Sequence, residues 1–216
     1  MWALFEKGGP VMWPLAILSV LTVAVLIEKI FGLRTSKVIQ GEIVSCIESI
    51  RTPADIPLAM KICERFDTPF ANIVRAGLAE ANKPMHIVRQ SMEDTGRREV
   101  KRLERYMVVL ETAAAAGPLL GLLGTVIGMI EVISVISVAG VGQAGMLSGG
   151  IAQALIATVF GLIIAVPALI LFNFLDARIE GMVMRIDEYS HMLLKRLSAM
   201  REGSDDELTE LEMRKR

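Results

Sequence analysis

The stretch GPLLGLLGTVIGM, Gly117–Met129, decides the fold. It holds no charged residue and lies in a run that begins after Glu111 and continues to about Ala139, with Glu131 as the only charge. Two similar runs occupy 11–31 and 148–175. A bilayer-spanning helix needs about 20 apolar residues. The sequence therefore predicts an all-α, polytopic membrane protein with three spans, at 11–31, 111–139 and 148–175.

The distribution of Lys and Arg predicts the orientation, because positively charged loops stay on the cytoplasmic side. Fourteen of the 23 basic residues lie in Lys29–Arg105, eight lie in Arg178–Arg216, and none lies in Ser137–Leu147. We expect the N-terminus outside and the C-terminus inside. The first span runs straight into Glu28 and Lys29 without an Ala-x-Ala cleavage pattern, which indicates a retained helix and not a signal peptide.

The remaining segments divide by composition. Residues 1–10 hold Trp2 and Phe5 and predict an outer-side interfacial segment, and 140–147 form a short outer loop. Residues 32–110 read as a cytoplasmic helical region with helices at 38–50, 56–66 and 70–81, each ending near a proline. From Met85 the helical pattern continues unbroken into the second span, so we expect that span to extend into the cytoplasm.

The third span also continues beyond the membrane. Residues 176–216 predict a cytoplasmic amphipathic helix and a tail, with a break at Gly203–Asp206. Apolar residues recur at three-and-four spacing and form a seam that needs a partner surface. They are Ile179, Met182, Ile186, Tyr189, Leu193 and Leu197.

The composition argues against a soluble enzyme or a nucleic-acid-binding protein. No metal-ligand cluster, phosphate-binding glycine loop or activated nucleophile is visible, so we expect no metal, no cofactor and no catalytic residue. His86 and His191 lie in charged helical surroundings and read as surface residues. The net charge of −1 indicates no polyanionic partner. Cys46 and Cys63 fall in the inward region, where thiols stay reduced.

Small residues line one face of each of the last two spans. The second span carries Gly117, Gly121, Gly124 and Gly128, and the third carries Gly161 among Ala154, Ala157, Ala165 and Ala168. Glycine costs about 1 kcal/mol per helical position relative to alanine, so a regular glycine face needs a packing reason. Close approach of helices within a membrane supplies that reason.

Thr125 and Thr158 are the polar side chains near the middle of these two spans. At 1.5 Å per residue they lie about 20 and 22 Å from the cytoplasmic side, at similar depth on antiparallel helices. Hydroxyls at that depth tend to face protein or a water-filled path. From the spacing alone, the alternative that each hydroxyl bonds to a carbonyl of its own helix remains open.

Other polar or helix-bending residues mark the same two spans. Gln153 and Glu131 lie nearer the outer side, Glu111 marks the inner end of the second span, and Asn173 marks that of the third. An intramembrane carboxylate is usually functional, but Glu131 can also reach the outer interface. Pro118 and Pro167 loosen their helices, which suits a moving part and is tolerable in a static one.

These motifs resemble those of the MotA/TolQ/ExbB proton-channel family. Gly117–Met129 is similar to the family's signature in the second span, and Gly150–Thr158 followed by Gly161, 165–168 and Asn173 is similar to its signature in the third. The opening Lys7–Leu15 resembles the ExbB-like branch. The whole chain fits the resemblance, with three spans and a cytoplasmic middle.

The resemblance implies a mechanism and partners. Such proteins form a homopentamer in the bacterial inner membrane, surrounded by lipid, around single-span helices of an ExbD- or TolR-like partner. The partner's aspartate carries the proton past threonines such as Thr125 and Thr158, with Gln153, Asn173 and Glu111 as further polar lining. Proton flow moves the partner and energises a TonB-like protein. Gln153 departs from the usual Glu and cannot titrate.

Three other functions stay open beside an ExbB-type motor. A TolQ-like subunit of an envelope-maintenance Tol-Pal system would carry the same motifs. A passive membrane scaffold would use the small-residue stripes only to hold helices together. A flagellar stator fits less well, because those chains carry four spans and a larger cytoplasmic domain.

Overall fold

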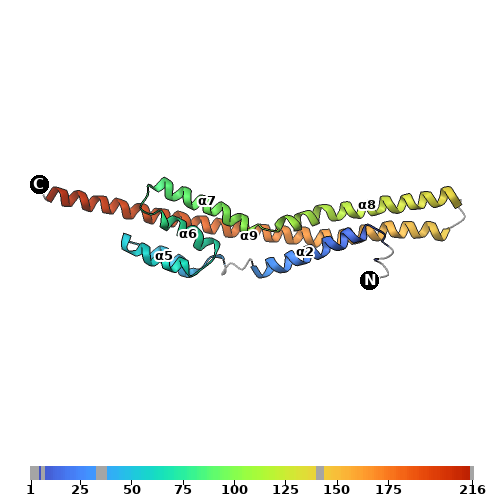
Figure 1. The fold of residues 1–216 in the computed structure, drawn as a ribbon, viewed down its shortest axis with the longest axis horizontal. Coiled ribbons are helices and arrows are strands. Elements are labelled where there is room, and N and C mark those ends of the chain that lie inside the picture. Colours follow the sequence, from blue (N-terminus) through green and yellow to red (C-terminus); the bar gives the residue numbers. More distant parts are fainter. Residues whose placement is uncertain (1–4, 6–7, 33–37, 140–143, 215–216) are drawn as a thin grey trace. The chain divides into compact units, whose positions relative to one another are not determined.

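The computed structural model describes residues 5, 8–32, 38–139 and 144–214, and every regular element within them is helical. The helices are α2 (Met12–Gly32), α4 (Gly41–Ser49), the short 3-10 helix η1 (Pro53–Asp55), α5 (Ile56–Glu64), α6 (Pro69–Ala79), α7 (Met85–Leu103), α8 (Met107–Ala139) and α9 (Ala144–Arg214) (Figure 1). Most of the expected outer segment 1–10, and residues 140–143 of the expected outer loop, lie outside the described residues.

Three of these helices are long and apolar enough to cross a membrane. The candidate spans lie in Met12–Lys29, Met107–Ser137 and Ser148–Arg201. The predicted fold class, an all-α polytopic membrane protein, is confirmed.

The chain divides into two compact units. Unit 1 contains Met1–Phe31 and Tyr106–Asp176, and unit 2 contains Gly32–Arg105 and Ala177–Arg216. α9 contributes its first part to unit 1 and the rest to unit 2.

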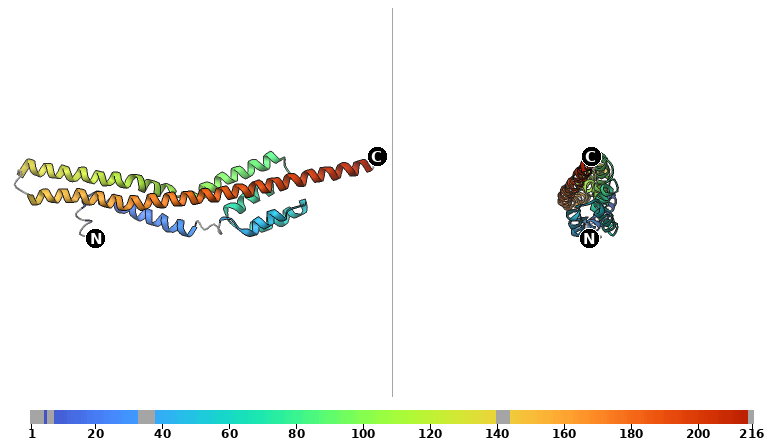
Figure 2. Two further views of the ribbon diagram at one scale, coloured as in Figure 1. Left: turned by 180° about the vertical axis from the view of Figure 1, so that it is seen from behind. Right: turned by 90° about the vertical axis from the view of Figure 1, so that its left-hand side faces the viewer.

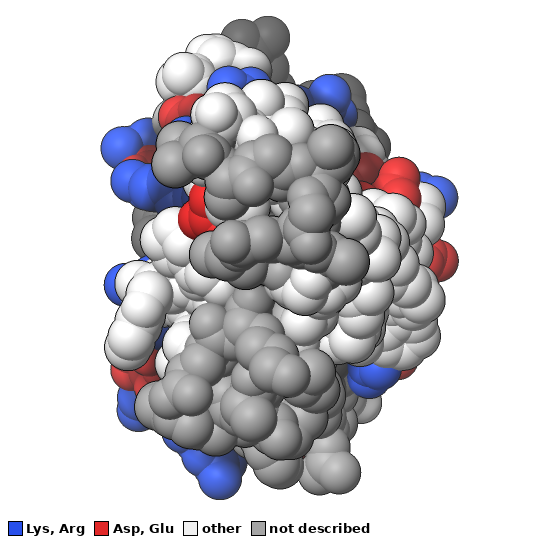
Figure 3. Space-filling view, turned by 90° about the vertical axis from the view of Figure 1, so that its right-hand side faces the viewer, with Lys and Arg blue, Asp and Glu red and all other residues white. Residues whose placement is uncertain are grey.

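Unit 1 is formed by α2, α8 and the first part of α9, and α8 and α9 run side by side in each lengthwise view (Figures 1 and 2). Its large apolar side chains point outward, among them Leu119, Leu122, Val126, Val159 and Ile163. Such a surface indicates lipid or another protein as its surroundings. Seen from the end where α8 finishes and α9 starts, the nearest described atoms are mostly uncharged (Figure 3).

A small apolar cluster packs the start of α2 against α8 and α9. Val11, Met12 and Leu15 are buried and are packed by Phe5, Leu120, Ile127, Phe160 and Ile164. The Phe5 ring meets Trp13 edge to face at a centroid distance of 5.5 Å. Gly9 supplies the turn before α2 with φ of 71°, a left-handed conformation that glycine adopts without steric cost.

Unit 2 is built from helices that pack around a buried apolar core. The predicted seam on α9 is confirmed as a buried face, because Ile179, Met182, Ile186, Leu193 and Leu197 are all at most 6% exposed. The sixth seam residue, Tyr189, meets Phe70 of α6 with ring centroids 5.6 Å apart. The partner surface that the seam requires is thus formed by helices of the same chain.

Local caps explain where α6 and η1 begin. The Thr68 hydroxyl accepts a hydrogen bond from the Ala71 amide at 3.3 Å, and Pro69 occupies the first helical position of α6. Thr52 and Asp55 form a capping box around η1. The amides of Arg51 and Thr52 donate to the Asp55 carboxylate and hold its pKa below the ordinary value.

Two expectations about helix ends are wrong. The helix that starts at Met85 does not run unbroken into the second span: α7 ends at Leu103, Tyr106 adopts φ of 67°, and α8 begins at Met107. The expected break at Gly203–Asp206 is also wrong, because α9 continues to Arg214. A single glycine in a helix costs only about 1 kcal/mol, which a long helix tolerates.

Candidate transmembrane polar site

The small-residue faces of α8 and α9 lie against each other. A β-carbon added to Gly117 would come within 2.9 Å of the Gly161 carbonyl oxygen, and one added to Gly128 within 2.7 Å of the Gly150 carbonyl oxygen. Gly124 faces Ala157. Backbone atoms cannot rotate away, so these contacts allow only glycine at the present separation of the helices.

Thr158 sits at the centre of this contact. A β-carbon on Gly121 would lie 3.0 Å from the Thr158 Cα. The Thr158 Oγ1 lies 3.3 Å from the Gly121 carbonyl oxygen of α8 and 3.4 Å from the Ala154 carbonyl oxygen of its own helix. One hydroxyl hydrogen is therefore shared between two acceptors on two helices.

The Thr158 hydroxyl is held more loosely than other hydroxyls of the spans. Thr22, Thr112 and Thr125 donate to carbonyls of their own helices at 2.7, 2.7 and 2.6 Å. O–H···O bonds have their most common length at about 2.7–2.8 Å. Both hydrogen bonds of Thr158 are longer than that. Of the four threonine hydroxyls, the Thr158 hydroxyl therefore loses the least hydrogen-bond energy when it turns to another acceptor.

Thr125 behaves differently from Thr158. Its Oγ1 donates to the Leu122 carbonyl oxygen, three residues back on the same helix, and its side chain is half-buried. The Thr158 hydroxyl bonds at Gly121, one helical turn or about 6 Å from Thr125 along α8. No hydrogen bond joins these two threonines, both of which the structure describes.

The other predicted site residues lie around this pair without joining it. Gln153 is half-buried on α9, where its Nε2 would be 2.5 Å from a β-carbon on Gly9. Glu111 and Asn173 are exposed on unit 1. α8 continues through Pro118, which is half-buried, and α9 continues through Pro167, which is exposed.

Sequence reasoning missed three features of unit 1. Thr22 is a buried hydroxyl in the first span, 7% exposed, and Lys29 at the end of α2 is only 6% exposed. Gly9 touches Gln153 across 144 positions of sequence. A single sequence carries no local signal for a contact between residues so far apart.

The middle of the chain matches a protein family. Residues 65–188 match the family described as the MotA/TolQ/ExbB proton channel family. The match begins at the end of α5 and includes all of α8 and the part of α9 that packs against it.

Individual relatives carry ExbB and TolQ names. An ExbB-like biopolymer transport protein of Synechocystis sp. is 32% identical over 175 residues, 79% of this chain and 68% of the relative. The biopolymer transport protein ExbB of Pseudomonas putida is 29% identical over 211 residues, 89% of this chain and 62% of the relative. The Tol-Pal system protein TolQ of Haemophilus influenzae is 35% identical over 100 residues, 44% of each chain.

Proposed function

Because the chain belongs to the MotA/TolQ/ExbB proton channel family, we propose that it is the channel and stator subunit of an ExbB-ExbD-type motor in the bacterial inner membrane. The chain acts as a channel component and not as an enzyme. Five copies surround the single-span helices of an ExbD- or TolR-like partner, with the N-terminus in the periplasm and the C-terminus in the cytoplasm. The motor energises TonB-dependent outer-membrane transport.

The observation that carries the proposal is the bonding of Thr158. Its hydroxyl lies between α8 and α9 with two long hydrogen bonds, at 3.3 and 3.4 Å, to carbonyls of both helices. A hydroxyl is both a hydrogen-bond donor and an acceptor. A hydroxyl whose present hydrogen bonds are weak can replace one of them with a hydrogen bond to a titrating carboxyl group. We assign the proton path to Thr158 and Thr125, with the titrating acid on the partner.

The energy available is adequate for such work. One elementary charge that crosses a potential of 100 mV releases about 2.3 kcal/mol. Gln153 can donate and accept hydrogen bonds but cannot titrate, so it lines the path without relaying charge. Glu111 and Asn173 line the cytoplasmic end.

Co-purification and an isosteric substitution together test the proposal. We expect the tagged chain, solubilised from its native membrane, to retain a single-span protein with an intramembrane aspartate. Thr158→Val keeps the shape and removes the hydroxyl, so it should leave that protein bound and strongly reduce proton-driven outer-membrane uptake. A passive scaffold predicts unchanged uptake in Thr158→Val, and that result would reject the proton path.

The TolQ-like function is the second candidate, because the TolQ protein of Haemophilus influenzae shares 35% identity over 100 residues. Deletion of the gene separates the two. An ExbB-type subunit predicts loss of TonB-dependent uptake with normal cell constriction, and a TolQ-type subunit predicts chained, leaky cells with normal uptake.

A further inference from the structure

Two large apolar side chains of unit 2 stand out in solvent. Among the described residues of that unit, Leu58 on α5 and Met184 on α9 are 64% and 63% exposed, whereas the core side chains are buried. A single exposed apolar residue is ordinary on a protein surface. The charges around each one therefore decide whether it belongs to a contact surface.

Met184 lies in an acidic stripe on α9. Glu180 and Glu188 are four residues before and after it, on the same helix face. Both are exposed, and neither forms an ion pair within 4.0 Å in the part of the chain that the structure describes. Asp187 borders the stripe, 3.6 Å from His191. The stripe presents one flexible apolar side chain between two carboxylates, with the exposed Arg185 next to it along the helix.

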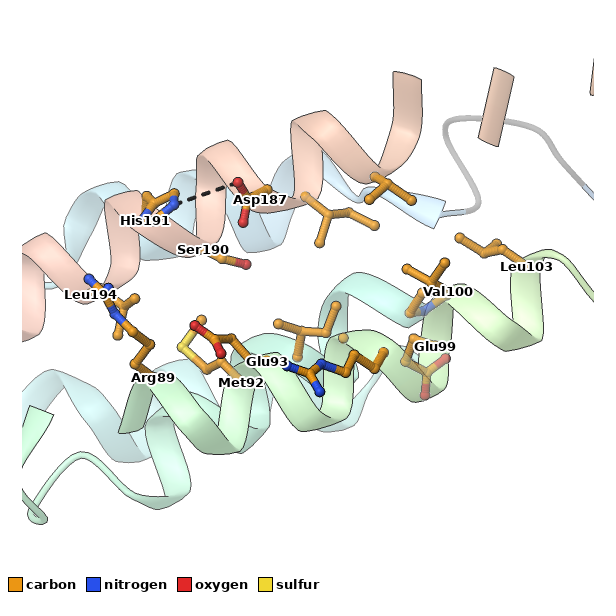
Figure 4. A pocket seen from close by; sticks show the side chains of 16 residues that line it. Arg89, Met92, Glu93, Glu99, Val100, Leu103, Asp187, Ser190, His191 and Leu194 are labelled. Carbon is orange, nitrogen blue, oxygen red and sulfur yellow. Dashed lines mark ion pairs between the residues drawn. The ribbon is translucent and has the colours of Figure 1, made fainter. Parts of the chain in front are cut away.

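A groove of about 360 Å³ lies between α7 and α9 on another side of the same helix. Val100 and Leu103 of α7 face α9 across it (Figure 4). The other apolar lining residues are Pro69, Ile73, Met92, Val183, Ile186 and Leu194. Met184 is not among the lining residues, so the stripe and the groove are different faces of unit 2.

Basic residues border the end of the groove where α7 finishes. Arg97 lines the rim, and Lys101 follows one turn later; both are exposed. Neither forms an ion pair within 4.0 Å among the residues that the structure describes. Three carboxylates also line the groove. Glu93 lies one turn beyond Arg97 in the other direction, Glu99 pairs with Arg102 at 3.8 Å, and Asp187 lies 3.6 Å from His191.

The two faces lie at the same height along α9. Val100 and Leu103 of α7 line the groove together with Val183 and Ile186 of α9. The end of α7 that carries Arg97 and Lys101 therefore stands opposite the part of α9 that carries Glu180 and Glu188. Copies in a closed ring are related by rotation without translation. In such a ring the acidic stripe of one copy therefore arrives at the height of Arg97 and Lys101 of the next.

We propose that Met184 of one copy seats in the α7–α9 groove of a second copy, with Glu188 toward Arg97 and Glu180 toward Lys101. Methionine suits this role because its unbranched side chain fills irregular apolar gaps. The contact joins two different faces and is therefore head-to-tail, the kind of contact from which a closed ring is built when the rotation between copies completes a full turn. This inference rests on the homo-oligomer of the proposed function. It identifies the cytoplasmic surfaces through which neighbouring subunits contact each other.

Cysteine cross-linking in membranes tests the contact. Cys46 and Cys63 are first replaced by alanine, and Met184→Cys is combined with Val100→Cys. Cα atoms within about 4.4–6.8 Å allow a disulfide, so oxidation should give a ladder of covalent species beyond the dimer on a non-reducing gel. The matched control combines Met184→Cys with Leu58→Cys, which is equally exposed and should give no ladder.

Charge reversal supplies the second readout. Glu188→Arg in the Met184→Cys, Val100→Cys background should reduce the ladder severalfold, and Arg97→Glu added to it should restore the ladder. Failure of the second reversal to restore cross-linking would overturn the pairing of Glu188 with Arg97.

The remaining outcomes separate this contact from the function on which it rests. A ladder from the control pair alone, a ladder that stops at the dimer, or an intramolecular disulfide would each overturn the contact. The contact is also overturned if neither cysteine pair cross-links while the purified protein remains oligomeric by native mass spectrometry. In that case the proposed function is not contradicted. A monomer by that measurement would overturn both.

Discussion

At the scale of single residues, four threonines in the spans separate by hydrogen-bond length. Thr22, Thr112 and Thr125 bond to their own helices at 2.6–2.7 Å, as intramembrane threonines commonly do. Thr158 alone of these four reaches a neighbouring helix. Thr125 therefore fits the alternative raised from the sequence, in which the hydroxyl donates to a carbonyl of its own helix. The Thr158 hydroxyl also reaches a carbonyl of the neighbouring helix α8.

Gly9 gives a prediction about conformational strain. Gly9→Ala should lower the free energy of unfolding by about 1–2 kcal/mol, because an L side chain pays that cost at a left-handed φ. Thermal unfolding in detergent measures the change. Gly145→Ala is the control, since nothing lies within 4 Å of its added β-carbon. Adding Gln153→Ala removes the steric contact with the new β-carbon but leaves the backbone strain at the positive φ. If the double variant regained the full wild-type stability, backbone strain would not be the cause.

Cys63 gives a prediction about pH. Burial raises the pKa of its thiol from 9.0 to about 11. Because the thiolate is the reacting form, the folded protein at pH 8 should react with N-ethylmaleimide about 100-fold more slowly than the unfolded chain. Mass spectrometry of labelled peptides measures the rates. Equal rates in the folded and unfolded chain would show that the thiol is not buried.

The same pKa difference determines how the stability of the folded protein changes with pH. The unfolded thiol deprotonates first as the pH rises, so the contribution of Cys63 to stability is complete below about pH 9 and is lost between pH 9 and 11.

At the scale of elements, the contact between α8 and α9 depends on glycine on both sides. A β-carbon on Gly161 would lie 2.5 Å from the Gly117 carbonyl oxygen and 3.1 Å from the Gly121 Cα. Both stripes could be predicted from the sequence, because glycine at spacings of three and four needs a packing reason. Their register could not, since it depends on which turns meet when two helices dock.

Gly161→Ala and Gly181→Ala should have opposite effects. The first forces two backbones apart, and overpacking of this kind costs about 1–3 kcal/mol. The second lies on the same helix with nothing within 4 Å of an added β-carbon, so alanine should stabilise it by up to about 1 kcal/mol. Thermal midpoints of the two variants in one detergent make the comparison. Destabilisation of equal size at both sites would contradict the close packing.

The helix break before α8 shows what the sequence could not predict. The residues Glu104, Arg105 and Tyr106 include no glycine, asparagine or proline, yet Tyr106 adopts a left-handed φ. The division into two units falls at this residue. Helices α5 and α6 were predictable because Pro57, Pro69 and Pro84 lie near their ends and limit backbone conformations locally.

At the scale of the whole molecule, membrane physics made the architecture predictable. Lipid cannot satisfy backbone polar groups, so long apolar runs must form helices, and the described part of the chain contains three such helices. The buried seam of α9 followed from its period. Long-range pairs such as Gly9 with Gln153, and Thr158 with Gly121, depend on the folded arrangement and have no local signal.

Proton flux through the reconstituted complex tests the central claim most directly. The chain is purified with its co-purifying single-span partner, placed in liposomes that contain a pH-sensitive dye, and energised by a potassium diffusion potential. Loss of a hydrogen bond worth about 1–3 kcal/mol should slow the flux in Thr158→Val roughly 5- to 150-fold, while Thr158→Ser stays close to wild type. The control Thr112→Val removes an exposed hydroxyl bonded to its own helix and should leave the flux unchanged. Wild-type flux in Thr158→Val, with the partner still bound, would contradict the account.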